Sequence, residues 1–210
     1  MVSVTSELFV TISTVIIFLL SAGLTFFIVK KYLKTKKLNL LYWSIALTVF
    51  TAAVLLEILM ANKIYSELII DLYLFLVAIL VQFLALGSFA LYNNRKFLSY
   101  YYIYSVLATV FLVITLILYP AGNIIKTHIV FGVLPLGIVI SSSFVTFPAA
   151  VFIILIAAIS YKKFKNKKLL SIIAGVIIVA MAGTLYIAAV PVFLYYAEFI
   201  GILLLWIGFM

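Results

Sequence analysis

A short basic stretch separates two long apolar runs of this sequence; it reads Lys-Lys-Tyr-Leu-Lys-Thr-Lys-Lys and covers residues 30–37. The run before it, about 8–29, has no charged residue, and the run after it, about 38–60, has only Glu57. A helix needs about 20 apolar residues to cross the hydrocarbon core of a bilayer. Both runs meet that requirement, so the stretch predicts a loop between two transmembrane helices.

The same alternation continues along the whole chain. Of the 210 residues, 69% are hydrophobic and 9% are charged, against about a quarter charged in a soluble domain. We therefore expect an all-α fold, a polytopic membrane helix bundle that forms a single transmembrane domain over residues 1–210. Seven transmembrane helices are expected, at about 8–29, 38–60, 68–92, 97–120, 136–161, 169–189 and 192–210.

The distribution of charge predicts the orientation. Three loops, at 30–37, 95–96 and 162–168, hold 12 of the 14 basic residues and fall on the same side of the expected bundle. The positive-inside rule makes that side cytoplasmic. We expect a multi-pass cell-membrane protein with its N-terminus outside, its C-terminus inside and anionic lipid of the inner leaflet beside the lysines. All five acids lie at or near the opposite face: Glu7, Glu57, Glu67, Asp71 and Glu198.

The chain offers little material for catalysis. It has no cysteine, one histidine and five acids, and it lacks a His-Glu-x-x-His stretch, a glycine-rich phosphate loop and a nucleophile elbow. A haem with two histidine ligands would need a second chain. We expect no enzyme activity, no metal, no cofactor and no nucleic-acid partner. The abundance of Lys, Ile and Tyr suits a thermophile, and a genome of low GC content produces much of the same bias.

Three carboxyl groups lie inside the expected apolar spans, where an ionisable side chain by default marks function. Glu57 is near the outer end of the second helix, Asp71 near the outer start of the third, and Glu198 less than two turns into the seventh. If the three converge, they hold a proton or a cation between them. The alternative is that Glu57 and Asp71 reach interfacial water and pair with Lys63 or Lys126. Glu198 is deeper and is the strongest candidate.

Two other polar residues are candidates for the same chemistry. His128, in the loop between helices four and five, either joins the carboxyl groups in a proton or metal site or is solvated surface. Gln82 lies at mid-membrane on the third helix and needs a hydrogen-bond partner, because an unsatisfied amide in lipid is costly. We expect an interhelical bond for Gln82, or contact with a substrate at the midplane.

The fifth helix contains Pro148, shortly after Ser143 and Thr146. Proline frees a backbone carbonyl and favours a kink, and nearby hydroxyl groups can satisfy the exposed backbone. These residues either form a gate on a polar path or allow close packing of helices.

The layout resembles known seven-helix proteins. Lys34-Thr-Lys-Lys-Leu38 is similar to Lys165-Asn-Lys-Lys-Leu169, which suggests two parallel units of three helices joined by a linker helix. This three-one-three layout is similar to sugar transporters built from PQ-loop repeats and, more loosely, to rhodopsins. The chain has no Pro-Gln pair and its last helix has no lysine for a retinal. The Leu-Ala-Leu-Gly stretch at 84–87 resembles uncharacterised prokaryotic seven-helix membrane proteins.

Three function classes follow from these features. Transport, or handling of protons or ions, is favoured by the outer acids and the proline of helix five. A non-catalytic subunit of a larger membrane complex, such as a respiratory assembly, is favoured by short loops and the lack of a catalytic constellation; its partners would be other membrane subunits or further copies of the chain. A sensory membrane module ranks last, because we expect it to need a cytoplasmic output domain.

Overall fold

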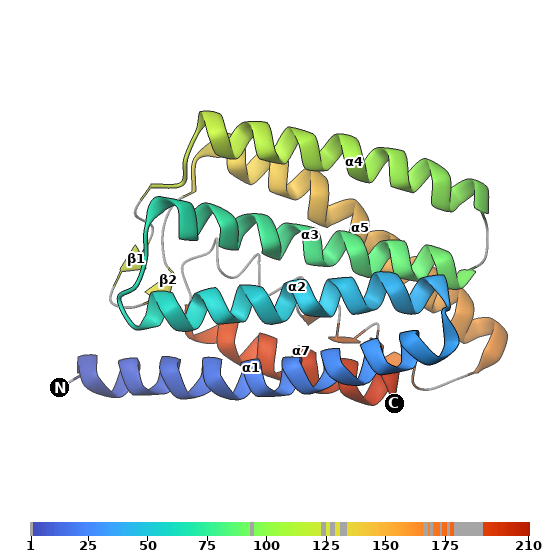
Figure 1. Ribbon diagram of the computed structural model, residues 1–210, viewed down its shortest axis with the longest axis horizontal. Coiled ribbons are helices and arrows are strands. Elements are labelled where there is room, and N and C mark those ends of the chain that lie inside the picture. The colour runs from blue at the N-terminus through green and yellow to red at the C-terminus, as the bar shows by residue number, and fades with distance from the viewer. Residues whose placement is uncertain are drawn as a thin grey trace.

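The computed structural model describes residues 2–92, 95–122, 125–126, 129–130, 134–165, 168, 170–172, 174–175, 177–178 and 191–210. Within these ranges six helices are complete and run along a common long axis (Figure 1). They are α1 (Val2–Thr35), α2 (Leu38–Ala61), α3 (Glu67–Tyr92), α4 (Arg95–Leu118), α5 (Leu136–Phe164) and α7 (Pro191–Phe209). The expected all-α fold class is confirmed.

The helix expected over 169–189 falls largely outside the described residues. Within this range the structure describes residues 170–172, 174–175 and 177–178, and these are helical. In the expected loop between helices four and five the structure adds a feature that the sequence did not predict. Two short strands, β1 (Ile125–Lys126) and β2 (Ile129–Val130), pair antiparallel, with Ile125 opposite Val130.

Five of the described helices are long and apolar enough to cross a membrane, and α7 contributes a shorter apolar stretch, Tyr195–Phe209. The helix ends extend beyond the spans expected from hydrophobicity. The first helix ends at Thr35 rather than near residue 29, so residues 30–35 of the basic stretch are helical. The bilayer fixes the length of the apolar span, whereas the helix itself can continue into water for as long as its residues permit.

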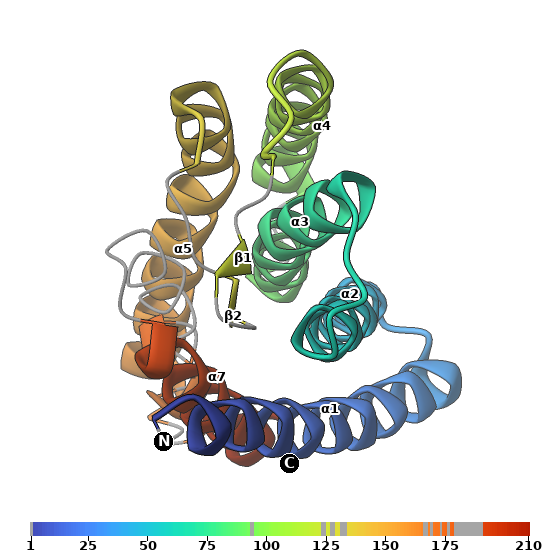
Figure 2. The same cartoon turned by 90° about the vertical axis from the view of Figure 1, so that its left-hand side faces the viewer.

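The helices are arranged around a central axis (Figure 2). Helix α2 packs between α1 and α3, α3 packs on α5, and α7 packs on α1. Helix α4 contacts α3 and α5 from outside this arrangement. The described residues before α7 pack on it, since Ser171 Oγ donates to the Leu204 carbonyl at 2.7 Å. The paired strands lie near the middle of the end-on view, and β2 contacts α2.

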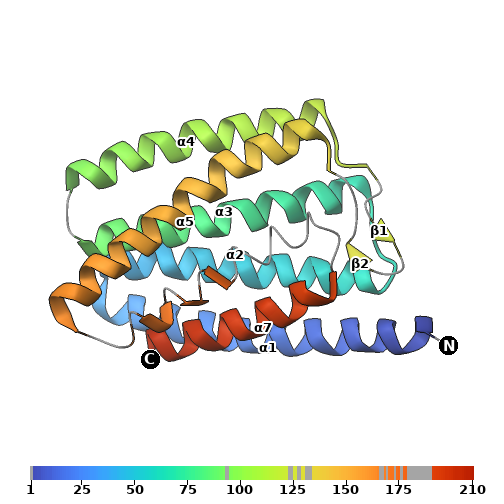
Figure 3. The same cartoon turned by 180° about the vertical axis from the view of Figure 1, so that it is seen from behind.

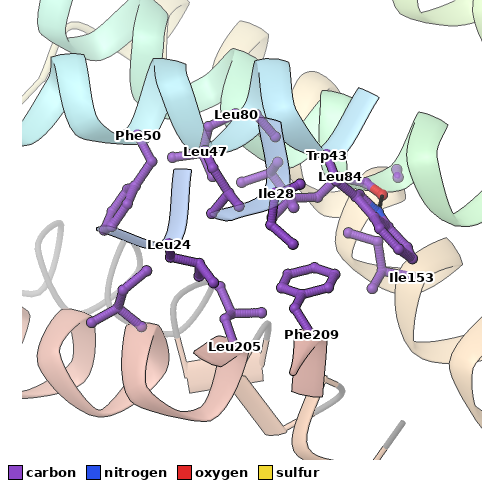
Figure 4. Close-up of a cluster of buried hydrophobic side chains, with 14 of the residues drawn as sticks. Leu24, Ile28, Trp43, Leu47, Phe50, Leu80, Leu84, Ile153, Leu205 and Phe209 are labelled. Atoms are coloured by element: carbon purple, nitrogen blue, oxygen red, sulfur yellow. Dashed lines mark hydrogen bonds between the residues drawn. The ribbon is translucent and has the colours of Figure 1, made fainter. Parts of the chain in front are cut away.

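The main core lies between α1, α2, α3, α5 and α7 (Figure 4). The side of α1 that faces it follows a spacing of three and four residues, as a helix with one packed face requires. The buried residues of that side are Val10, Thr14, Ile17, Ser21, Leu24 and Ile28.

The packing of α2 on α3 depends on one glycine. Trp43 Nε1 donates to the Leu84 carbonyl at 3.3 Å, and its ring covers Gly87. A Cβ atom at Gly87 would lie 2.3 Å from Trp43 Cδ1, so only glycine allows this approach.

The two ends of the bundle differ in charge. The ends of α1, α3 and α5 that carry the basic loops meet at one end of the molecule, and α7 finishes there (Figures 1 and 3). The N-terminal end of α1, the turn from α2 to α3 and the start of α7 lie at the other end, which we call the acidic end. Glu57, Glu67, Asp71 and Glu198 belong to helix turns near the acidic end.

Candidate functional site: two buried carboxyl groups

Two of the three expected carboxyl groups are buried inside the bundle, within electrostatic reach of each other. Glu57 lies in the last two turns of α2 and is 3% exposed, and Glu198 lies in the second turn of α7 and is 6% exposed. The two side chains are close enough to interact electrostatically. They come from helices that are far apart in the sequence, so their approach is produced by the packing of the whole bundle.

Each carboxyl group has an oxygen with unused hydrogen-bonding capacity. Glu57 Oε1 accepts a hydrogen bond from the hydroxyl group of Tyr73 on α3. The Oε2 atoms of Glu57 and Glu198 are buried and have no hydrogen-bond partner among the residues that the structure describes. Burying an unpaired carboxylate is costly. This arrangement therefore favours either a proton held by the pair or a bound cation between them.

Asp71 does not join this pair. It lies two residues before Tyr73 on α3, which places it on a different side of the helix, and it is half-buried. Its Oδ1 accepts a hydrogen bond from the backbone N–H of Ala121 at 3.1 Å. Asp71 thus holds the chain where it leaves α4, which is a structural role that the sequence analysis did not consider.

Gln82 has partners at both ends of its amide. Its Nε2 donates to the Ser105 carbonyl at 3.1 Å, and its Oε1 accepts from Thr109 Oγ1 at 2.9 Å. The side chain is 4% exposed and joins α3 to α4. The expected interhelical bond is present, and both the nitrogen and the oxygen of the amide bond to α4.

The residues around Pro148 form a different kind of contact. Pro148 cannot donate to the carbonyl of Phe144, four residues earlier. The hydroxyl group of Tyr104 on α4 donates to that carbonyl instead. Thr146 Oγ1 bonds within its own helix, to the Ser142 carbonyl at 2.9 Å, and Ser143 is exposed on the outer surface. The freed carbonyl is thus satisfied from a neighbouring helix rather than by the hydroxyl groups of α5.

One candidate lies outside the described residues, and one residue of the site was not a candidate. His128 lies outside the described residues, so its place relative to the carboxyl pair stays a prediction. Tyr73 was missed by the sequence analysis, although a signal for it exists. Glu57 and Tyr73 are each eight residues from Tyr65 in the turn between α2 and α3, and residues equally far from a tight antiparallel turn lie at the same height.

No protein family, curated protein or solved structure matches this chain. The case for a function therefore rests on the side chains themselves.

Proposed function

We propose that this chain is a multi-pass protein of the cell membrane that moves protons or small cations across the bilayer, with Glu57 and Glu198 as the site that binds them. The observation that carries the proposal is the pair of buried carboxyl groups with unpartnered Oε2 atoms. An intramembrane acid that serves packing alone would have its oxygens satisfied, because an unsatisfied polar group in this environment is costly.

The position of the pair suits the entry of a proton or cation from one side of the membrane. Both residues lie within two helical turns of the acidic end, which the basic loops at the opposite end assign to the outside. Tyr73 holds Glu57 in place by its hydrogen bond to Oε1, and Oε2 has no hydrogen-bond partner among the described residues. A proton or cation entering from the acidic end would meet these oxygens first.

The decisive experiment measures ion flux into liposomes that contain the purified protein, with a dye that reports the internal pH. Glu57→Gln and Glu198→Gln keep the size of the side chain and remove the ionisable group. We expect each to abolish most of the flux. Glu67→Gln is the matched control, because Glu67 is exposed in the first turn of α3 at the same end of the molecule. Unchanged flux in both test variants would remove the site.

The flux measurement is repeated under sodium and potassium gradients at constant pH. Flux that follows the pH gradient alone identifies the proton as substrate, and flux that needs one of the salts identifies that cation. Wild-type protein without flux under any of these gradients would contradict the proposed function.

The alternative proposal is a non-catalytic subunit of a larger membrane complex. It is favoured by the outlying position of α4, whose main contacts are with α3 and α5. Large apolar side chains of α4 face outward at a spacing of three and four residues: Tyr100, Ile103, Leu107, Val110, Ile114 and Ile117. Purification in a mild detergent followed by native mass spectrometry tests this proposal. Co-purifying subunits in fixed stoichiometry would support it, and a chain that purifies alone and carries flux would exclude it.

A further inference from the structure

Three residues other than glycine have a positive φ in the part of the chain that the structure describes, and all three are lysines. They are Lys36 with φ 52°, Lys63 with φ 67° and Lys165 with φ 53°. Glycine adopts this left-handed conformation without steric penalty and is the usual residue where a helix ends in it. A lysine at such a position indicates that its side chain contributes something that glycine cannot.

Lys36 and Lys165 end their helices by the same device. The backbone N–H of Lys36 donates to the Tyr32 carbonyl at 2.7 Å after α1, and that of Lys165 donates to the Tyr161 carbonyl at 2.8 Å after α5. Both helices therefore finish with a tyrosine, three intervening residues and a left-handed lysine. Lys63 differs, because its N–H donates to the Met60 carbonyl in the turn at the acidic end.

The lysines that end these two helices lie at the surface of the basic end. Lys36 and Lys165 are exposed, and Lys36 Nζ lies 5.4 Å from the centre of the Tyr32 ring. The flanking cations are also exposed: Lys34 and Lys37 beside the first, Lys162 and Lys168 beside the second. Every acid in the sequence lies elsewhere, at 7, 57, 67, 71 and 198. The basic end therefore carries a large excess of positive charge.

We propose that each of these two helix ends binds the headgroup of an anionic phospholipid. The lysine ammonium groups donate to the phosphate oxygens, and the tyrosine ring lies at headgroup depth. The depth of these lysines in the membrane favours a lipid over a soluble polyanion. Lys36 directly follows one apolar span, and Lys165 lies three residues beyond the end of another. The inference rests on the proposed placement in a membrane and is independent of the role of Glu57 and Glu198.

The test uses glycine, which keeps the backbone conformation and removes the charge. Wild type, Lys36→Gly, Lys165→Gly and the double variant are purified in a neutral detergent. Phosphatidylglycerol or phosphatidylcholine is then added, and the midpoint of thermal unfolding is measured. Lys63→Gly is the control, since it has the same backbone conformation at the opposite end. Lys36→Gln and Lys165→Gln provide a second pair that removes the charge and keeps a polar side chain only one atom shorter than lysine.

We expect phosphatidylglycerol to raise the midpoint of wild type and of Lys63→Gly equally, and phosphatidylcholine to raise it less. Each single test variant loses part of the phosphatidylglycerol shift and the double variant loses most of it. Native mass spectrometry should show two fewer bound phosphatidylglycerol molecules on the double variant. An undiminished shift in the double variant, an equal shift with phosphatidylcholine, or an equal shift with soluble polyglutamate would overturn the proposal. Ion flux is measured in the same variants, because this measurement distinguishes a failure of lipid binding from a failure of the carboxyl site.

Discussion

At the scale of single residues, the hydroxyl group of Tyr73 is the only described partner of Glu57 Oε1. We expect Tyr73→Phe to lower the free energy of unfolding by about 1–3 kcal/mol, because it leaves a buried carboxyl oxygen unsatisfied. The measurement is chemical unfolding in mixed micelles. Tyr65→Phe serves as control, since Tyr65 is an exposed tyrosine in the turn at the same end. An equal loss in both variants would show that the bond between Tyr73 and Glu57 contributes nothing specific.

A second residue-scale prediction concerns Gly87. Gly87→Ala places a Cβ atom against the Trp43 ring, and we expect a loss of roughly 1–3 kcal/mol from overpacking, with a shift in tryptophan fluorescence. Gly137→Ala is the matched control, because there the nearest atom is Tyr119 Cδ2 at 3.3 Å and α5 gains in helix propensity. Similar stability in the two variants would contradict the close approach of α2 and α3.

The same scale shows what the sequence could predict about the site. Glu57 and Glu198 were found because an acid within an apolar run is visible without a structure. The separation of Asp71 from Glu57 and Glu198 could not be predicted, because it depends on which side of each helix faces the centre of the bundle. The uniformly apolar composition of these helices hides that direction, since a membrane helix is apolar on its packed side and on its lipid side alike.

At the scale of elements, the link between α4 and α5 depends on Pro148. The Phe144 carbonyl that the proline frees is satisfied by Tyr104, so the two substitutions should be coupled. We expect Tyr104→Phe to destabilise the protein by about 1 kcal/mol. In the Pro148→Ala background the alanine N–H satisfies the same carbonyl, so Tyr104→Phe should then cost much less. Unfolding of the four proteins in micelles completes the double-mutant cycle, and additive effects would contradict the link.

Helix existence and order could be predicted from hydrophobicity, while the ends and the contacts could not. The start of α2 at Leu38 agrees with the expectation because the left-handed Lys36 and the extended Lys37 separate it from α1. Helix α1 continues through the earlier lysines because lysine is a good helix former. The strands β1 and β2 are two residues long, which is too short for any periodic pattern.

At the scale of the whole molecule, the packing agrees with two parallel units of three helices. If α1, α2 and α3 correspond to α5, the partly described helix and α7, then the contact of α3 with α5 corresponds to that of α7 with α1. The linker role expected for the fourth helix fits the position of α4 outside the other helices (Figure 2). The repeat that the two lysine-rich stretches suggest stays a prediction, because most of the expected sixth helix lies outside the described residues.

The separation of charge between the two ends makes a prediction about topology. Because cations of short loops stay on the cytoplasmic side, the turns at Lys37 and Lys96 should both face the cytoplasm and the turn at Ile64 should face outward. The membrane potential adds to this preference by about 2.3 kcal/mol per charge per 100 mV. The chain has no cysteine, so single substitutions Lys37→Cys, Lys96→Cys and Ile64→Cys report each position without background. All three positions are exposed, so a membrane-impermeant maleimide can reach each of them from its own side.

In intact cells we expect the maleimide to label Ile64→Cys alone, and the other two variants to become labelled only after the membrane is permeabilised. Labelling of Lys37→Cys and Lys96→Cys from opposite sides would contradict the arrangement of the helices. Labelling of both positions from outside would agree with the fold but would show that it is inverted in the membrane. In that case Glu57 and Glu198 would open to the cytoplasm, and a site that accepts its proton or cation from outside would become one that releases it inward.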